Sequence, residues 1–176
     1  MEKRAWPSVA LVIGLALFFG LVVLPRYGSK QDAEAGKPAP DFVLPVIWGG
    51  EAGNRIRLSN LSGKAVVLDF WASWCGPCKT QANIVDQIAR RYESRDVTVI
   101  GINTGDSREA ALAFLQSRAL SYPSLLDDDA AVAGAYRVRQ LPTLVVIDTQ
   151  GRIVAVRRRL VREKELAELV DEALGT

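Results

Sequence analysis

The chain of 176 residues has a globular composition, with 49% hydrophobic and 24% charged residues, and its formal net charge of +2 is too small to indicate nucleic acid as a partner. Histidine is absent, which excludes Cys-His nucleophilic catalysis and histidine metal sites. The two cysteines, Cys75 and Cys78, are too few for a four-cysteine zinc site, so no metal is expected and redox chemistry is the main use left for the pair.

The N-terminal segment contains an apolar stretch from Trp6 to Leu24, whose 19 residues come near the roughly 20 needed to cross the hydrocarbon core of a bilayer. A cleavable signal peptide would have a shorter apolar region followed promptly by small residues, whereas Pro25-Arg26-Tyr27 follows here. A buried core helix is a third interpretation. We predict an uncleaved transmembrane anchor over residues 1–24, with its N-terminus inside because few polar residues precede the span.

A polar segment, residues 25–40, follows the anchor and is predicted to be a flexible tether. Fully extended, it could reach at most about 50–55 Å. The remaining residues, 41–176, are enough for one ordinary domain. The predicted organisation is therefore an anchor, a tether and one soluble domain.

The domain is predicted to open with a hairpin. Its first strand, within residues 41–46, contains Pro45, which favours an edge position in a sheet. A glycine-rich turn over residues 49–54 leads to a second short strand over residues 56–58. The run from Ala65 to Phe70 is almost wholly apolar, as expected of a central strand buried on both faces, and Asp69 is its exception.

Helices and strands alternate in the rest of the chain. Residues 77–91 and 110–118 carry apolar residues at helical spacing, and Asp106 with Glu109 has the form of a capping box that opens the second of these helices. The other predicted elements are a strand over 97–102, an extended piece over 122–126, a short helix over 129–136, a hairpin of 143–147 with 153–156, and a C-terminal helix with one apolar stripe. This order indicates an α/β domain with a mixed sheet.

Two charged clusters have two interpretations each. The three aspartates at 127–129 could bind a cation, although a loop that caps the following helix is the simpler interpretation. The arginines at 157–159, together with Arg162, could contact anionic lipid headgroups, although a solvated basic edge is favoured.

Both cysteines lie where the strand that ends near Phe70 meets the helix that begins near Pro77. At a helix start, unpaired backbone N–H groups and the positive end of the dipole stabilise a thiolate, which lowers the pKa of the first cysteine. The second cysteine, three residues later, can reach back to close a disulfide. Gly76-Pro77 between them fits as well, because proline is well tolerated at the first positions of a helix.

These features resemble the thioredoxin superfamily, specifically its membrane-tethered TlpA/ResA-like thiol:disulfide oxidoreductases. The resemblance covers roughly residue 36 to the C-terminus. The motifs that carry it are Gly36-Lys-Pro-Ala-Pro-Asp-Phe42, Leu68-Asp-Phe-Trp-Ala-Ser-Trp-Cys-Gly-Pro-Cys78, Leu141-Pro142-Thr143 and Ile147-Asp-Thr-Gln-Gly-Arg-Ile153. It implies a thioredoxin fold, with a mixed central sheet flanked by helices, an N-terminal β-hairpin extension and a central helical insertion.

The resemblance also implies roles for individual residues. Cys75 should be the attacking thiolate, and Cys78 the more buried resolving thiol. Asp69 matches a buried acid beneath the disulfide, where burial would raise its pKa and let it act as a base for Cys78; a carboxylate satisfied by backbone N–H groups is the alternative. The residues expected to contact substrate are Trp74, Gly76, Pro77, Leu141 and Pro142, with the Leu141-Pro142 bond cis, whereas Trp71 is expected to pack in the core.

Gln81, Asn83 and Asp69 depart from the pattern of these relatives, many of which carry Asn at the position of Asp69, and Gly101 departs from the pattern of thioredoxin. Where the relatives often have Glu and Pro soon after the second cysteine, this chain has Gln81 and Asn83, so a titratable helix carboxylate is missing. The lysine that accompanies the buried acid in thioredoxin is replaced by Gly101. Asp69 is therefore expected to have an even higher pKa than usual or to rely on water.

The predicted function is reduction of protein disulfides on the periplasmic or extracytoplasmic side of the bacterial cytoplasmic membrane, with cytochrome c maturation as one use. The partners expected are disulfide-bearing proteins, a membrane thiol-reductant donor and the membrane itself through the N-terminal helix. No cofactor is expected besides the redox-active Cys75–Cys78 disulfide. The alternatives are a redox-inactive binding module, a disulfide-forming oxidase and a peroxidase, the last lacking a Thr-x-x-Cys context at Cys75.

Overall fold

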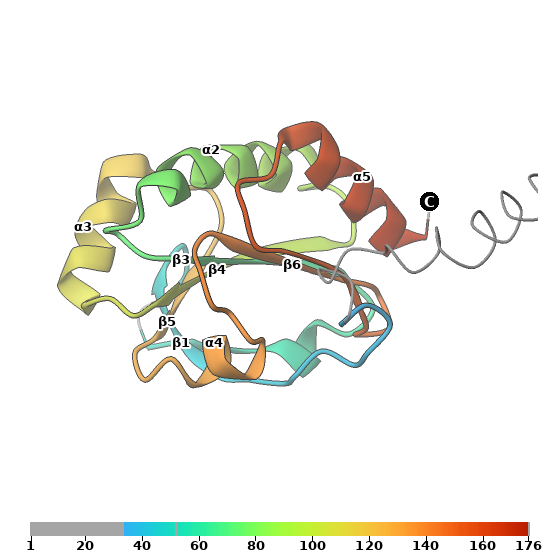
Figure 1. The fold of residues 1–176 in the computed structure, drawn as a ribbon, viewed down its shortest axis with the longest axis horizontal. Coiled ribbons are helices and arrows are strands. Elements are labelled where there is room, and N and C mark those ends of the chain that lie inside the picture. Colours follow the sequence, from blue (N-terminus) through green and yellow to red (C-terminus); the bar gives the residue numbers. More distant parts are fainter. Residues whose placement is uncertain (1–33, 52, 176) are drawn as a thin grey trace, which may run out of the picture. The chain divides into compact units, whose positions relative to one another are not determined.

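A computed structural model describes residues 34–51 and 53–175 of the chain (Figure 1). The predicted transmembrane anchor and residues 25–33 of the predicted tether lie outside these residues, so both stay predictions. Within the described part, no helix has the length and apolar character that a membrane crossing requires.

The described residues form one compact unit from Glu34 onward, built from seven strands, four α-helices and one 3₁₀ helix. In chain order these are β1 (Val43–Trp48), β2 (Arg55–Arg57), η4 (Leu58–Leu61), β3 (Ala65–Trp71), α2 (Gly76–Arg91), β4 (Val97–Thr104), α3 (Arg108–Arg118), β5 (Ser124–Asp127), α4 (Ala131–Ala135), β6 (Thr143–Ile147), β7 (Ile153–Arg157) and α5 (Glu163–Leu174).

The strands form a single mixed sheet in the order β2-β1-β5-β4-β3-β6-β7. β3 pairs parallel with β4 and antiparallel with β6, and β4 pairs parallel with β5, while the outer pairs are antiparallel. Helices α2, α3 and α5 cover one face of the sheet and α4 lies on the other (Figure 1). The predicted α/β fold with a mixed sheet flanked by helices is confirmed.

β3 is the central strand, and all seven of its residues are buried, as its apolar sequence predicts. Alternate residues of β3 point to opposite faces, so they enter two different cores. Val67 and Trp71 pack with the apolar sides of α2, α3 and α5, whereas Leu68 and Phe70 pack with β1 and α4. Because Asp69 alternates with Leu68 and Phe70, its side chain lies on the same face as α2.

The predicted hairpin is present as β1 and β2, but the edge position predicted for the strand with Pro45 is wrong. β1 lies second from the edge, because the short β2 covers its outer side. Its register with β5 involves Val46 and Trp48 only, so Pro45 lies in the part of β1 that pairs with β2 alone. Proline can occupy this position because it is not one of the residues in register with β5.

The first described residues lie along the outer edge of β7. Gly36 N donates to Ile153 O at 2.8 Å, Ile153 N to Lys37 O at 2.9 Å, and Ala39 N to Gly151 O at 2.9 Å. Arg158 and Glu34 form a half-buried ion pair at 2.8 Å in the same region. Residues 34–39, which the tether was predicted to include, therefore contact the domain directly.

Residues of both charged clusters, the aspartates at 127–129 and the arginines at 157–159, form hydrogen bonds or ion pairs within the domain. The buried Asp127 carboxylate accepts hydrogen bonds from Val132 N and Ala133 N at the start of α4, which matches the capping interpretation. In the basic cluster, Arg159 pairs with Glu165 at 2.7 Å and Arg158 with Glu34 at 2.8 Å, so these two arginines are ion-paired, whereas the favoured interpretation was a solvated edge.

Candidate active site

The two cysteines lie at the turn from β3 into α2. Cys75 is the N-cap residue of α2, with an extended backbone, and its Sγ accepts a hydrogen bond from Cys78 N at 3.3 Å. Pro77 sits in the first turn, where its missing N–H costs nothing. The N–H of Cys78 and the positive end of the helix dipole therefore face the Cys75 sulfur, and no acidic residue in the first turn opposes them.

Cys75 and Cys78 form a disulfide with an S–S distance of 2.04 Å and a Cα–Cα distance of 5.3 Å. Cys75 is 5% exposed and Cys78 is 1% exposed, in the order that the sequence predicts. Next to them Trp74 is 66% exposed, whereas Trp71 is buried and donates from Nε1 to Ser124 Oγ. A protein substrate can thus approach the sulfur of Cys75 over Trp74, while Cys78 lies behind it.

Asp69 is fully buried on β3, on the α2 face of the sheet. Neither carboxylate oxygen has a hydrogen bond of normal geometry with any residue that the structure describes. Burial raises the pKa of Asp69 from 3.8 to about 7, and the hydroxyl of Tyr122 opposes this rise only partly. The interpretation of Asp69 as a carboxylate satisfied by backbone N–H groups is therefore wrong, and a carboxyl that titrates near neutral pH can take up a proton at working pH.

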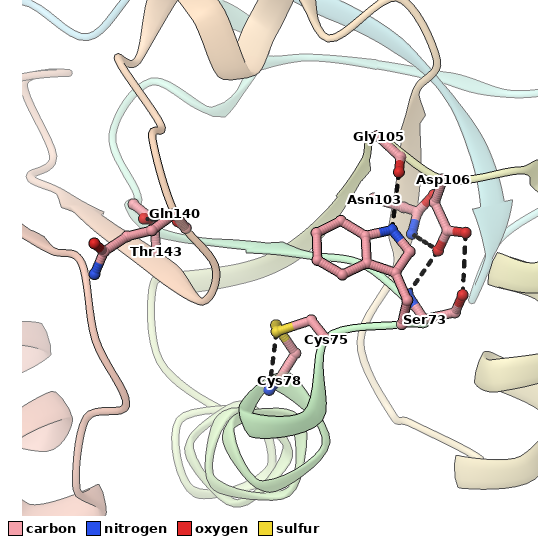
Figure 2. The surroundings of a disulfide bond; sticks show 9 residues. Ser73, Cys75, Cys78, Asn103, Gly105, Asp106, Gln140 and Thr143 are labelled. Carbon is pink, nitrogen blue, oxygen red and sulfur yellow. Dashed lines mark hydrogen bonds between the residues drawn. A yellow bond between two sulfur atoms is a disulfide. The ribbon is translucent and has the colours of Figure 1, made fainter.

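The loop before β6 lies opposite the disulfide (Figure 2). The Leu141–Pro142 peptide bond is cis, as the resemblance implies. Pro142 is buried and Leu141 half-buried, and Thr143 Oγ1 donates to Gln140 O at 2.8 Å, which holds the loop at the start of β6. The structure therefore brings together the predicted residues of the dithiol turn and of this loop.

Asp106 fixes the other side of the dithiol turn, a role that the sequence analysis missed. Its carboxylate accepts hydrogen bonds from Ser73 N at 2.6 Å, Ser73 Oγ at 3.0 Å and Asn103 Nδ2 at 3.1 Å (Figure 2). One residue before it, Gly105 adopts a positive φ of 62°, and its carbonyl accepts from Trp74 Nε1 at 2.9 Å. The loop after β4 thereby holds both residues that precede Cys75.

The capping box predicted from Asp106 and Glu109 is therefore wrong. Ser107 is the N-cap of α3, and its Oγ accepts from Ala110 N at 3.1 Å. A usable signal was present, because Asp106 and Ser73 each follow one of two neighbouring strands, and the carboxyl ends of parallel strands share an edge.

Replacing Asp106 with alanine is expected to lower the rate of disulfide reduction several-fold, mainly through KM, and to cost about 1–3 kcal/mol of stability, because four donors, Ser107 N among them, lose their acceptor. Steady-state kinetics with a protein disulfide and urea unfolding of the full chain would measure both. Asp41→Ala is the matched control, since Asp41 accepts from the backbone N and Oγ of Ser59 in the same way outside the site. Equal kinetic losses in the two variants would contradict the assignment.

Two departures from the pattern of the relatives now have a structural explanation. Gln81 is fully buried, and its Oε1 accepts from Val161 N at 2.8 Å, so it ties α2 to the segment before α5. Gly101 lies directly opposite Asp69 in the parallel register of β3 and β4. This is the place expected for the residue that replaces the lysine beside the buried acid of thioredoxin.

Comparison with known proteins gives consistent matches. Residues 35–156 match the AhpC/TSA family. The thiol-disulfide oxidoreductase ResA of Bacillus subtilis is 36% identical over 156 residues, which cover 88% of this chain and 85% of the relative.

Solved structures are similar as well. A Chlorobium tepidum protein assigned as thiol:disulfide interchange protein DsbE aligns with a TM-score of 0.72 and 29% identity, covering 79% of this chain and 96% of that one. A secreted thiol-disulfide isomerase from Corynebacterium glutamicum aligns with a TM-score of 0.70 and 29% identity, covering 78% and 86%.

Proposed function

Since the chain belongs to the AhpC/TSA family of the thioredoxin superfamily and is a thiol-disulfide oxidoreductase of the ResA and DsbE type, we propose that it reduces disulfides in other proteins. The observation that carries this proposal is the position of Cys75 as the N-cap of α2, beside an exposed Trp74 and opposite the Pro142 loop. A thiolate is stabilised there and can be reached by a partner protein.

The reaction begins from the dithiol. The Cys75 thiolate attacks one sulfur of the substrate disulfide, so a Cys75–substrate bond forms and the second substrate sulfur leaves as a thiolate, which takes up a proton. Cys78 then gives its proton to Asp69, and its thiolate attacks the Sγ of Cys75. The Cys75–Cys78 disulfide forms, and the first substrate sulfur leaves. Two electrons have moved to the substrate, which is now a dithiol.

The loop around Pro142 and the indole of Trp74 are proposed to bind the substrate chain. The loop that contains Pro142 lies opposite the disulfide (Figure 2), so an extended substrate can lie along its backbone. Leu141, Gly76 and Pro77 complete the contact surface. None of these residues carries a charge, which suits recognition of backbone rather than of one particular side chain.

The Gly76-Pro77 dipeptide supports the reducing direction. Strong oxidants often owe their high reduction potential to an over-stabilised thiolate with a histidine between the cysteines, and this chain has no histidine there. We predict a reduction potential below about −220 mV, toward thioredoxin at about −270 mV and away from DsbA at about −120 mV. Equilibration of the full chain with glutathione buffers would measure it. A potential near that of DsbA would identify the protein as a disulfide-forming oxidase instead.

The location and partners form the finer part of the proposal. Residues 1–24 would anchor the protein in the bacterial cytoplasmic membrane, with the domain on the periplasmic or extracytoplasmic side, where a membrane thiol reductant recharges it. Apocytochrome c is proposed as one substrate. Labelling of Cys75 in intact cells by a membrane-impermeant thiol reagent, after mild reduction, would test the location, and labelling only after lysis would contradict it.

A further inference from the structure

The space beside Asp69 is filled by the side chains that surround Gly101, the residue opposite it. A Cβ at Gly101 would lie 2.9 Å from Ser124 Oγ, 3.0 Å from Trp71 Nε1 and 3.3 Å from Tyr122 Cε2. Any larger residue at this position would collide with these atoms. The absence of a side chain at Gly101 therefore lets the ring of Tyr122 pack against Gly101, the residue in register with Asp69 on the neighbouring strand.

The position of Tyr122 is fixed from both sides along the chain. Before it, Ser121 donates from its backbone N and its Oγ to Asp86 on α2, at 2.7 and 2.6 Å. After it, Pro123 O accepts from Gly101 N at 2.9 Å. The ring of Tyr122 is thereby held between α2 and β4, with only 3% of the residue exposed.

Few polar groups are available to Asp69 at this place. Trp71 Nε1 already donates to Ser124 Oγ at 3.2 Å, and Leu144, which faces Asp69 from β6, is apolar. Two further donors are buried on the helix-covered side of the sheet, the hydroxyl of Tyr122 and Nε2 of Gln81 on α2, which has no hydrogen-bond partner in the described part of the chain. Of these two, the Tyr122 hydroxyl is the one that acts on the pKa of Asp69. The two side chains influence each other, since the Tyr122 hydroxyl lowers the pKa of Asp69, while burial, followed by the charges of Asp69 and Asp86, raises the pKa of Tyr122.

We propose that Tyr122 is a positioning residue for Asp69, whose hydroxyl donates a hydrogen bond to the carboxylate each time Asp69 ionises. This inference rests on the proposed role of Asp69 as the base for Cys78. When Asp69 takes the proton of Cys78 it becomes neutral and needs no donor, and when it releases that proton the Tyr122 hydroxyl stabilises the charge. Tyr122 thus sets the pH at which Asp69 is able to accept a proton.

The direct test follows the titration of the Asp69 carboxyl by ¹³C NMR in the full chain, in the disulfide form, where the cysteines do not titrate. Removal of the hydroxyl in Tyr122→Phe is expected to raise the pKa of Asp69 by about one unit, because a hydrogen bond to the charged form is lost. Fluorotyrosine at position 122 keeps the hydroxyl and is expected to leave the pKa at or below the wild-type value.

Tyr92→Phe is the matched control, because Tyr92 is as buried as Tyr122 but its hydroxyl donates to Ala167 O and Asp171 Oδ1. This variant should leave the titration of Asp69 unchanged. An unchanged pKa in Tyr122→Phe, or the same shift in both variants, would overturn the proposal. The proposal would also be overturned if fluorotyrosine at position 122 raised the pKa of Asp69 as much as Tyr122→Phe does.

A second measurement separates this proposal from the proposed function. The pH profile of the resolving step should move upward in Tyr122→Phe, and the same substitution in an Asp69→Asn background should not move it further. A changed Asp69 titration with an unchanged profile would support the pairing of Tyr122 with Asp69 while refuting Asp69 as the base. A profile that moves equally in the Asp69→Asn background would refute the pairing.

Discussion

Replacement of Cys75 by serine is expected to lower the rate of disulfide reduction by at least about a thousandfold, because the residue that forms the covalent intermediate is lost. Insulin reduction by the full chain, followed by turbidity, would measure it. Trp74→Ala is a useful comparison, since it alters the neighbouring contact surface but leaves both thiols. If the serine variant reduced insulin as fast as wild type, Cys75 would not be the nucleophile, and if wild type itself reduced no insulin, the chain would be a redox-inactive binding module.

Cys78→Ala should differ from Cys75→Ser in a characteristic way. Without the resolving thiol, the first attack still occurs, but the mixed disulfide with the substrate persists. The variant is expected to complete one half-reaction and to accumulate partners that dithiothreitol releases. Identification of these partners by mass spectrometry would test the proposal of apocytochrome c. Accumulation of the same adducts in the Cys75→Ser variant would show that the order of the two thiols is reversed.

The second large effect is expected from Asp69→Asn. The pKa of Asp69 is about 7 in the folded chain and 3.8 in the absence of burial, so the folded protein binds the proton more tightly. Protonation of Asp69 therefore contributes to the free energy of unfolding in full below about pH 4, and this contribution is lost as the pH rises through about 7. A difference of three pKa units corresponds to about 4 kcal/mol, so the variant should be more stable than wild type at pH 8 by up to this order and little different at pH 4.

Urea unfolding of the full chain at pH 4, 6 and 8 would measure this effect. Asp41→Asn is the control of opposite sign: burial raises the pKa of Asp41, but the hydrogen bonds from Ser59, Arg57 and the backbone of Phe42 together outweigh it and hold that pKa below its ordinary value. A stability difference for Asp69→Asn that did not vary with pH would contradict the assignment. The gain in stability should come with a loss of activity, with the resolving step slowed about a hundredfold because its general base is missing.

Features of the site that depend on nearby residues could be predicted from the sequence. The apolar run before Asp69, the N-cap cysteine and the proline in the first turn of α2 form one continuous segment, and local rules cover them. The loop around Pro142 is remote in sequence, and it could be predicted only because the motif that contains it resembles a known family.

The contacts that were missed depend on the alignment of neighbouring strands. Ser73 and Asp106 are 33 residues apart and meet because β3 and β4 run parallel and end at the same edge. Tyr122 packs in a similar way against Gly101, the residue in register with Asp69 on the neighbouring strand. The local pattern at Asp106 was misleading as well, since an acid three residues before Glu109 has the form of a cap.

The pairing of residues 36–39 with the edge of β7 bears on how far the domain can travel. On the proposed topology, residues 25–33 separate the anchor from the part of the chain that the structure describes, and nine residues reach at most about 30 Å. A nine-residue tether lets the domain reach only about a fifth of the volume that a 16-residue tether would allow. The effective concentration of the domain near the membrane surface is correspondingly higher. A shorter tether favours reaction with partners that are themselves held at the membrane over partners that diffuse freely.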